Sequence, residues 1–187
     1  MAAVRLRRVK EEYGDKVIIG VKSFPLYPGH APQRLINPHS IEGRRRASEA
    51  EEDAKITPWD ESLYYPSSSM PALEAAKCAA LQGEEAFERY DLAIFEAFFH
   101  KSKDISQRDT LLELAETADL DMTKFAADLD EGGQREKVLT DFEEAKSSFG
   151  HMVTGVPFVT LEDKYPLVGA MPTEVYRRVV ESALNPS

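Results

Sequence analysis

The stretch TGVPFV, residues 154–159, places a proline directly in front of a run of strand-forming residues. Pro157 has no N–H, so it cannot donate to a strand ladder and is expected at the start or edge of a sheet. A cis Val156–Pro157 bond would explain this arrangement, because cis bonds occur almost only before proline and mark tight turns. The sequence therefore predicts a turn at Val156–Pro157 that leads into a strand.

The residues after this turn predict a β-hairpin and a final helix. The strand-like segments PFVTL and YPLV are separated by the three residues EDK, a loop length that is common in hairpins. Pro166 lies in the second segment and favours a place at a sheet edge. The following segment, residues 172–184, carries valines and a tyrosine at helical spacing, which predicts an amphipathic helix.

The N-terminal residues predict a helix and then a strand. Apolar residues from Ala2 to Tyr13 recur on one helical face, with the charged residues, Arg5 among them, turned away. Gly14 provides an end for this helix. The segment KVIIGVKSF, residues 16–24, is apolar on both faces at its start, as in a buried parallel strand. We expect the second half of a βαβ unit whose first strand is not in the sequence.

The middle of the chain divides into two parts. Residues 27–69 are rich in proline, with one short helix expected around residues 41–54, and predict an irregular excursion. Residues 70–150 predict four or five helices with glycines at several of their ends. We therefore expect residues 1–26 and 151–187 to form one core, with the excursion and a helical insertion between its halves.

In this order the elements resemble the thioredoxin fold with the helical insertion of the DsbA-like family. The resemblance is carried by residues 5–26, residues 75–106 and, most specifically, TGVPFVTLEDKYPLVGAMPTEVY at residues 154–176. It is strongest to the cytoplasmic branch of thiol-disulfide oxidoreductases and to relatives such as 2-hydroxychromene-2-carboxylate isomerase and kappa-class glutathione transferase. The implied fold class is α/β, a thioredoxin-like sheet with an inserted helical subdomain, here with the N-terminal strand missing.

The resemblance also implies a binding site. In the family, a cis-proline turn packs against a Cys-x-x-Cys or related motif at the start of the first helix and offers backbone hydrogen bonds to a peptide or to glutathione. Gly155, Val156 and Pro157 are therefore the expected substrate-binding residues. The chain starts inside that helix, so the motif is absent and no catalytic residue is assigned. We expect a truncated chain or a start codon placed too late, or else a gap that a partner chain fills.

Three functions remain open from the resemblance. The leading hypothesis is a DsbA-like thiol-disulfide oxidoreductase without its own Cys-x-x-Cys in this chain, which acts on peptide or protein thiols and disulfides. The first alternative is a glutathione-dependent isomerase or transferase of the 2-hydroxychromene-2-carboxylate isomerase type. The second is a non-catalytic, peptide-binding thioredoxin-fold module. We expect no cofactor, with glutathione as the alternative, and a homodimer stays open.

Composition and charge narrow the classes of partner. Acidic residues give a formal net charge of -10, which opposes nonspecific binding to nucleic acid. No apolar stretch reaches the length of about 20 residues that a membrane span needs, and the N-terminus has no apolar signal core. The cytoplasm is the expected location. The run of arginines at residues 44–46 is followed by acidic residues and is expected to be a solvated face.

The cysteine and histidine content predicts no metal or disulfide site. Cys78 is the only cysteine, which excludes an intrachain disulfide and a zinc site built on several cysteines. It lies among alanines and is expected to be an inert, buried residue. His30 and His39 are expected at the surface of the excursion, and His151 in a loop. Trp59 is expected to anchor the excursion to the core, with an apolar binding groove as the alternative.

Overall fold

A computed structural model describes residues 1–187 except 27, 30, 31, 33, 163, 186 and 187. The chain forms two compact units. The first combines Met1–Lys22 with Glu144–Ser187, and the second consists of Ser23–Glu143. His30, which was expected at the surface, lies outside the described residues.

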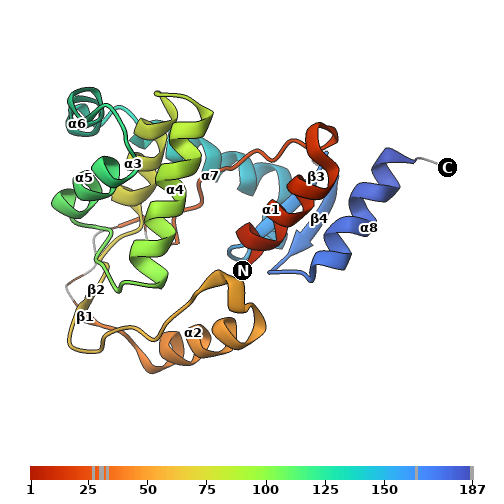
Figure 1. The fold of residues 1–187 in the computed structure, drawn as a ribbon, viewed down its shortest axis with the longest axis horizontal. Coiled ribbons are helices and arrows are strands. Elements are labelled where there is room, and N and C mark those ends of the chain that lie inside the picture. The colour runs from red at the N-terminus through yellow and green to blue at the C-terminus, as the bar shows by residue number, and fades with distance from the viewer. Residues whose placement is uncertain (27, 30–31, 33, 163, 186–187) are drawn as a thin grey trace. The chain divides into compact units, whose positions relative to one another are not determined.

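The first unit contains two helices, a hairpin and two short 3-10 turns, and it also includes the end of the long helix α7 (Arg135–Phe149). Its elements are α1 (Ala2–Tyr13), a 3-10 turn (Gly14–Lys16), a second 3-10 turn (Gly150–Met152), β3 (Phe158–Leu161), β4 (Tyr165–Val168) and α8 (Thr173–Leu184). Helices α1 and α8 lie side by side (Figure 1). The predictions of these two helices and of the hairpin are confirmed.

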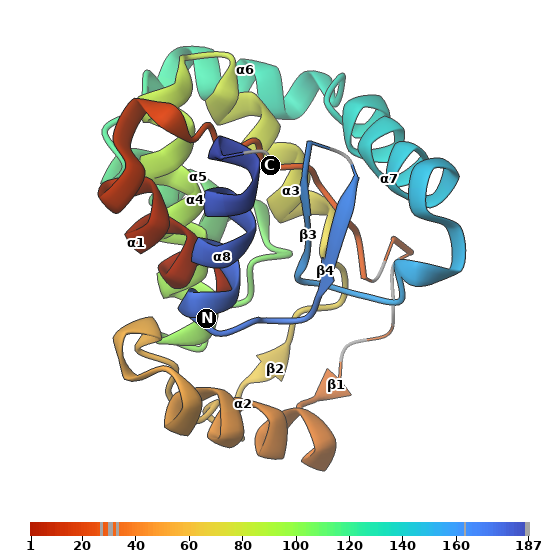
Figure 2. The same cartoon turned by 90° about the vertical axis from the view of Figure 1, so that its right-hand side faces the viewer.

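A small apolar core joins the two helices to the hairpin. Val9 of α1 and Tyr176 of α8 are almost completely buried and pack with Val159 and Leu167. These last two residues lie opposite each other on β3 and β4, so their side chains point to the same face of the hairpin. The two strands are antiparallel (Figure 2), and each has one edge without a strand partner among the described residues.

The strand predicted over residues 16–24 is wrong. Gly14–Lys16 form a 3-10 turn, and the residues that follow form no strand. Val17 has an extended backbone, but its N–H bonds to the Gly14 carbonyl and its own carbonyl accepts a hydrogen bond from Lys10. Ile18 is 88% exposed. A strand needs a hydrogen-bonded neighbour, and no described residue pairs with the backbone of residues 18–21.

The second unit is a helical cluster with a long irregular segment at its start. Its elements are β1 (Arg34–Leu35), α2 (Pro38–Ala50), a 3-10 turn (Glu52–Ala54), β2 (Tyr64–Tyr65), α3 (Met70–Ala80), α4 (Glu84–Phe99), α5 (Arg108–Thr117), α6 (Met122–Glu131) and most of α7 (Arg135–Phe149). Within the described residues, none of the helices has the length and apolar character needed to cross a bilayer.

Helices α3 to α6 pack around one core (Figure 1). Helix α3 is rich in alanine, and Ala75 and Ala79 are fully buried, which lets neighbouring helices approach closely. The Tyr90 and Phe125 rings fill the centre with their centroids 5.1 Å apart. The Tyr90 hydroxyl donates a hydrogen bond of 3.0 Å to the Leu111 carbonyl, so this buried polar group is satisfied. The prediction of a helical cluster is confirmed.

The excursion is more ordered than expected. Helix α2 begins at Pro38, earlier than predicted, because the Asn37 side chain accepts a hydrogen bond of 2.8 Å from the Ser40 N–H and caps the helix. Strands β1 and β2 form a short antiparallel ladder that was not predicted. The Trp59 ring is 3% exposed and packs 5.6 Å from the Phe98 ring, so Trp59 anchors the excursion.

Arg44 corrects the expectation of a solvated arginine run. It is only 6% exposed, and its guanidinium donates hydrogen bonds to the carbonyls of Thr57, Phe98 and Phe99. The last two carbonyls lie at the end of α4, where the helix leaves its own acceptors without helical partners. Arg45 and Arg46 are exposed and pair with Glu42, as expected of a solvated face.

Candidate functional site

The predicted turn Gly155–Pro157 lies just before β3, two residues after the 3-10 turn Gly150–Met152. Its Val156–Pro157 peptide bond is cis. Val153 on one side of the turn is buried, whereas the Val156 side chain is 51% exposed. The turn therefore presents an apolar side chain to solvent next to the first residue of a strand.

The backbone of Val156 is also available for binding. Neither its N–H nor its carbonyl makes a hydrogen bond to another described residue. A donor and an acceptor on one residue, next to a strand that has no strand partner on one edge among the described residues, are the groups that an added extended chain pairs with. Gly155 precedes them and carries no side chain that could cover them. The three predicted site residues thus form one continuous surface.

The turn is fixed by the residue that follows the second strand of the hairpin. The Gly169 N–H donates a hydrogen bond of 2.9 Å to the Pro157 carbonyl. Gly169 directly follows β4 and has a φ of 85°, in the left-handed region that favours glycine. On the other side, the Phe158 ring packs 5.1 Å from the Phe149 ring. The backbone that leaves the turn is therefore held at Pro157 and at Phe158.

The link between β4 and α8, residues 169–171, is held by side chains of α1 and α8. The Arg5 guanidinium donates hydrogen bonds to the carbonyls of Ala170 at 2.9 Å and Met171 at 3.0 Å. The Met171 N–H donates to the Tyr176 hydroxyl at 3.3 Å. Burial raises the pKa of Tyr176 above its ordinary value, so its hydroxyl stays protonated at neutral pH.

Arg5 was missed by the sequence analysis, which placed it among the residues turned to solvent. Helix α1 has several cations along it, and nothing in their spacing separates the one that reaches a loop from the ones that face water. The sequence gives an indication of this contact only in the loop that Arg5 binds. The glycine that follows the second hairpin strand indicates a sharp change of direction, and carbonyls at such a change need donors.

The single cysteine does not belong to this surface. Cys78 lies in α3 and is 1% exposed, which confirms the expectation of an inert, buried residue. Burial raises the pKa of its thiol to about 12. The thiolate is the nucleophile in disulfide exchange, so the raised pKa and the burial both oppose reaction of this thiol near neutral pH. His151 is exposed in the turn before the site. In the described part of the chain, no group of three His, Cys, Asp or Glu side chains could hold a metal ion.

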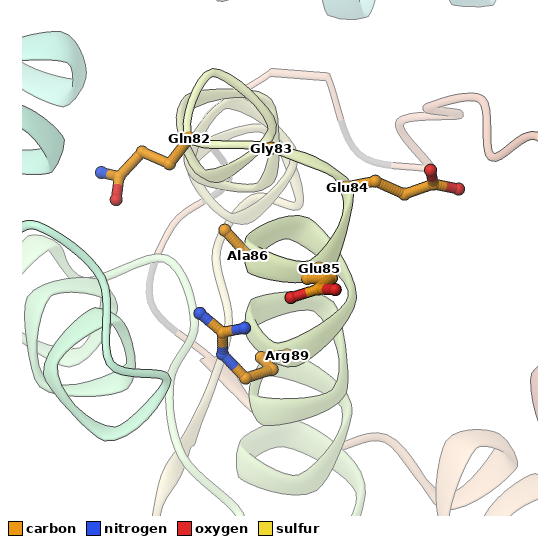
Figure 3. Close-up of a pocket in the computed structure, with 6 residues that line it drawn as sticks. All are labelled: Gln82, Gly83, Glu84, Glu85, Ala86 and Arg89. Carbon is orange, nitrogen blue, oxygen red and sulfur yellow. The ribbon is translucent and has the colours of Figure 1, made fainter.

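A cavity of about 380 Å³ lies elsewhere, at the start of α4 (Figure 3). Its lining includes Gln82, Gly83, Glu84 and Arg89. The Arg89 side chain already donates a hydrogen bond to the Ala118 carbonyl, and Glu84 is directed away from it. The described residues that line the cavity include no thiol, hydroxyl or histidine that could act as a nucleophile. It is therefore a weaker candidate than the turn.

Solved structures share this fold at low sequence identity. A probable DsbA oxidoreductase from Streptomyces coelicolor aligns over 100% of this chain and 84% of its own, with a TM-score of 0.78 and 22% identity. A candidate protein disulfide isomerase from Nitrosomonas europaea aligns over 97% of this chain and 89% of its own, with a TM-score of 0.68 and 20% identity. At such identities the similarity shows the fold.

The comparison with protein families extends over nearly the whole chain. No curated protein matches it. The family model described as the DSBA-like thioredoxin domain matches residues 1–181. Together with the structural neighbours, this match confirms the expected α/β, thioredoxin-like fold with a helical subdomain. Since the match covers far more than half of the residues, the chain belongs to the family of DSBA-like thioredoxin domains.

Proposed function

We propose that this chain binds an extended segment of a protein thiol or disulfide substrate at Gly155, Val156 and Pro157, as a member of a thiol-disulfide oxidoreductase family. The 187 residues supply substrate docking, and the redox dithiol is not among them. Family membership supports the substrate class, because DSBA-like domains act on protein thiols. We propose the cytoplasm as the location of this chain.

One observation carries this proposal. Val156 combines a half-exposed apolar side chain with a backbone N–H and carbonyl that have no partner among the described residues. An extended peptide can pair with both groups at once, because its own N–H and carbonyl alternate along the backbone. The apolar side chain then offers contact area to a residue of the peptide. Main-chain pairing of this kind accepts many sequences, which suits a protein with many substrates.

Cys78 cannot perform the redox step in the described structure. Disulfide exchange requires a thiolate that reaches a disulfide sulfur, and a second thiol that resolves the mixed disulfide. The Cys78 thiol is buried in the helical cluster and its pKa is raised to about 12 by that burial. We therefore assign no electron transfer to the chain's own residues.

The experiment is a titration of the protein with a peptide, monitored through the amide NMR signals of the protein. The probe is an unstructured ten-residue peptide with one central cysteine between apolar residues, and a matched peptide carries serine in its place. We expect both peptides to shift the amide signals of Gly155 and Val156, because docking uses the main chain. A peptide that is N-methylated at the paired residue loses one hydrogen bond and is expected to bind about fivefold to tenfold more weakly.

The control variant is Leu184→Ala, which shortens a partly exposed apolar side chain at the end of α8. It should bind like the wild type, whereas Val156→Ala should bind more weakly. Shifts confined to residues away from the turn would contradict the proposal. Glutathione is titrated in parallel, and binding of glutathione without binding of either peptide would also overturn it in favour of the glutathione-dependent alternative.

A further inference from the structure

We propose that Arg5 is a positioning residue for the turn Gly155–Pro157. This inference rests on the proposed function, because it concerns how the same turn is held. Arg5 lies in the first turns of α1, and its guanidinium reaches the link between β4 and α8. There one terminal nitrogen donates hydrogen bonds to two successive carbonyls, of Ala170 at 2.9 Å and of Met171 at 3.0 Å. Such charge-assisted bonds are stronger than neutral ones.

The position of the link also determines the position of the turn. Phe158 lies opposite Val168 in the hairpin, so Pro157 and Gly169 are the next residues along the two strands. The Gly169 N–H donates to the Pro157 carbonyl at 2.9 Å. Gly169 is covalently joined to the residue whose carbonyl Arg5 holds. A shift of the link therefore shifts the Pro157 carbonyl and, with it, the adjoining peptide group of Val156.

The same link is held a second time from α8, which makes its position well defined. The Met171 N–H donates to the Tyr176 hydroxyl, and Tyr176 is 2% exposed. Arg5 and Tyr176 therefore bind neighbouring groups of the link from two different helices. Tyr176 also fills the apolar core, so its removal would disturb packing as well. Arg5 is the member of the pair whose removal tests positioning with less effect on the core.

The unit contains a matched control for Arg5. Arg177 of α8 donates a hydrogen bond of 2.6 Å to the Glu12 carboxylate of α1, so it joins the same two helices. No interaction of Arg177 with the link 169–171 is found among the described residues. The loss of either arginine removes a contact between polar groups of this unit, but only Arg5 acts on the link.

The test compares Arg5→Met with Arg177→Met. Methionine keeps much of the aliphatic length of arginine but donates no hydrogen bond. In Arg5→Met we expect faster amide hydrogen exchange at Gly169 and roughly tenfold weaker binding of the cysteine peptide. In Arg177→Met both quantities should equal those of the wild type. Arg5→Lys should recover part of both, because an ammonium group can still donate to the carbonyls.

Two outcomes overturn the inference. Equal Gly169 exchange in the two methionine variants would show that Arg5 does not hold the link. Faster exchange with unchanged peptide affinity would show that the link does not position the turn. The exchange rate is measured without peptide, so it tests whether Arg5 holds the link even if the wild type binds no peptide. The absence of peptide binding to the wild type would instead reject the proposed function. If Arg5→Met does not fold, Arg5→Lys is compared with Arg177→Lys in the same way.

Discussion

Arg44 shows how the surroundings of a single side chain decide its role. Three arginines in succession point in three directions around α2, and the sequence gives them the same chemistry. Only Arg44 meets the carbonyl end of α4, together with the rings of Trp59 and Phe98, whose centroids lie 5.4 and 5.3 Å from its guanidinium carbon. This role depends on a helix that begins forty residues later in the chain, so local patterns could not predict it.

We predict that Arg44→Met lowers the free energy of unfolding by about 3 kcal/mol, since it removes three hydrogen bonds and leaves the part-buried carbonyls of Thr57 and Phe98 without a donor, whereas the Phe99 carbonyl keeps the Thr57 N–H. Urea unfolding followed by the fluorescence of Trp59 measures the change. Arg46→Met, on the exposed face of the same helix, should cost less than about 0.5 kcal/mol. Equal midpoints for the two variants would show that the hydrogen bonds of Arg44 contribute little.

The turn at Gly155–Pro157, unlike the role of Arg44, was predictable from the sequence because its cause is local. Proline imposes its constraint on its own backbone and on the residue before it, whatever lies nearby. The sequence therefore located the turn and its three residues, which the structure brings to one surface. It did not locate Arg5, whose contacts cross more than 160 residues.

At the level of elements, the helices were largely predictable, whereas the short strands β1 and β2 were missed and one predicted strand does not form. A helix satisfies its hydrogen bonds within itself, so its apolar period appears directly in the sequence, as in α1 and α8. A strand takes its hydrogen bonds from another segment. Residues 16–24 have strand-like composition, but no described segment pairs with residues 18–21. The hairpin was predictable because its two strands are partners separated by a short loop.

We predict that Ile18→Ser changes the free energy of unfolding by less than about 0.5 kcal/mol, because this side chain is 88% exposed. Val9→Ala, which shortens a side chain that is 2% exposed in the core of the same unit, should cost about 2 kcal/mol. Both changes are measured by chemical denaturation. A cost for Ile18→Ser as large as that of Val9→Ala would mean that residues 17–21 are buried, as the sequence had suggested.

For the whole molecule, we predict that this chain does not accelerate the reduction of insulin by dithiothreitol. Turnover requires two reactive thiols, whereas the chain has one cysteine, which is buried in α3 with its pKa raised to about 12. A thiol reagent at pH 8 should leave the native protein unmodified and should label one thiol after unfolding.

The matched variant for this assay is Cys78→Ala, which removes the only sulfur able to form a disulfide. Wild type and variant should give the same rate of insulin precipitation as buffer with dithiothreitol. Acceleration by the wild type that is lost in Cys78→Ala would contradict the buried position of the thiol. It would also assign redox chemistry to the helical cluster.

The left-handed backbone at Gly169 limits which missense mutations this position tolerates. A base change at either of the first two positions of a glycine codon introduces a side chain or a stop, and an L-residue held in this conformation costs about 1 to 2 kcal/mol. Space is not the obstacle, since no heavy atom of the described residues, apart from Gly169 and its two chain neighbours, lies within 4 Å of where a Cβ would stand. Selection at this codon would thus act on the backbone conformation of Gly169. Surveys of tolerated variants should find few substitutions at this position despite its open surroundings.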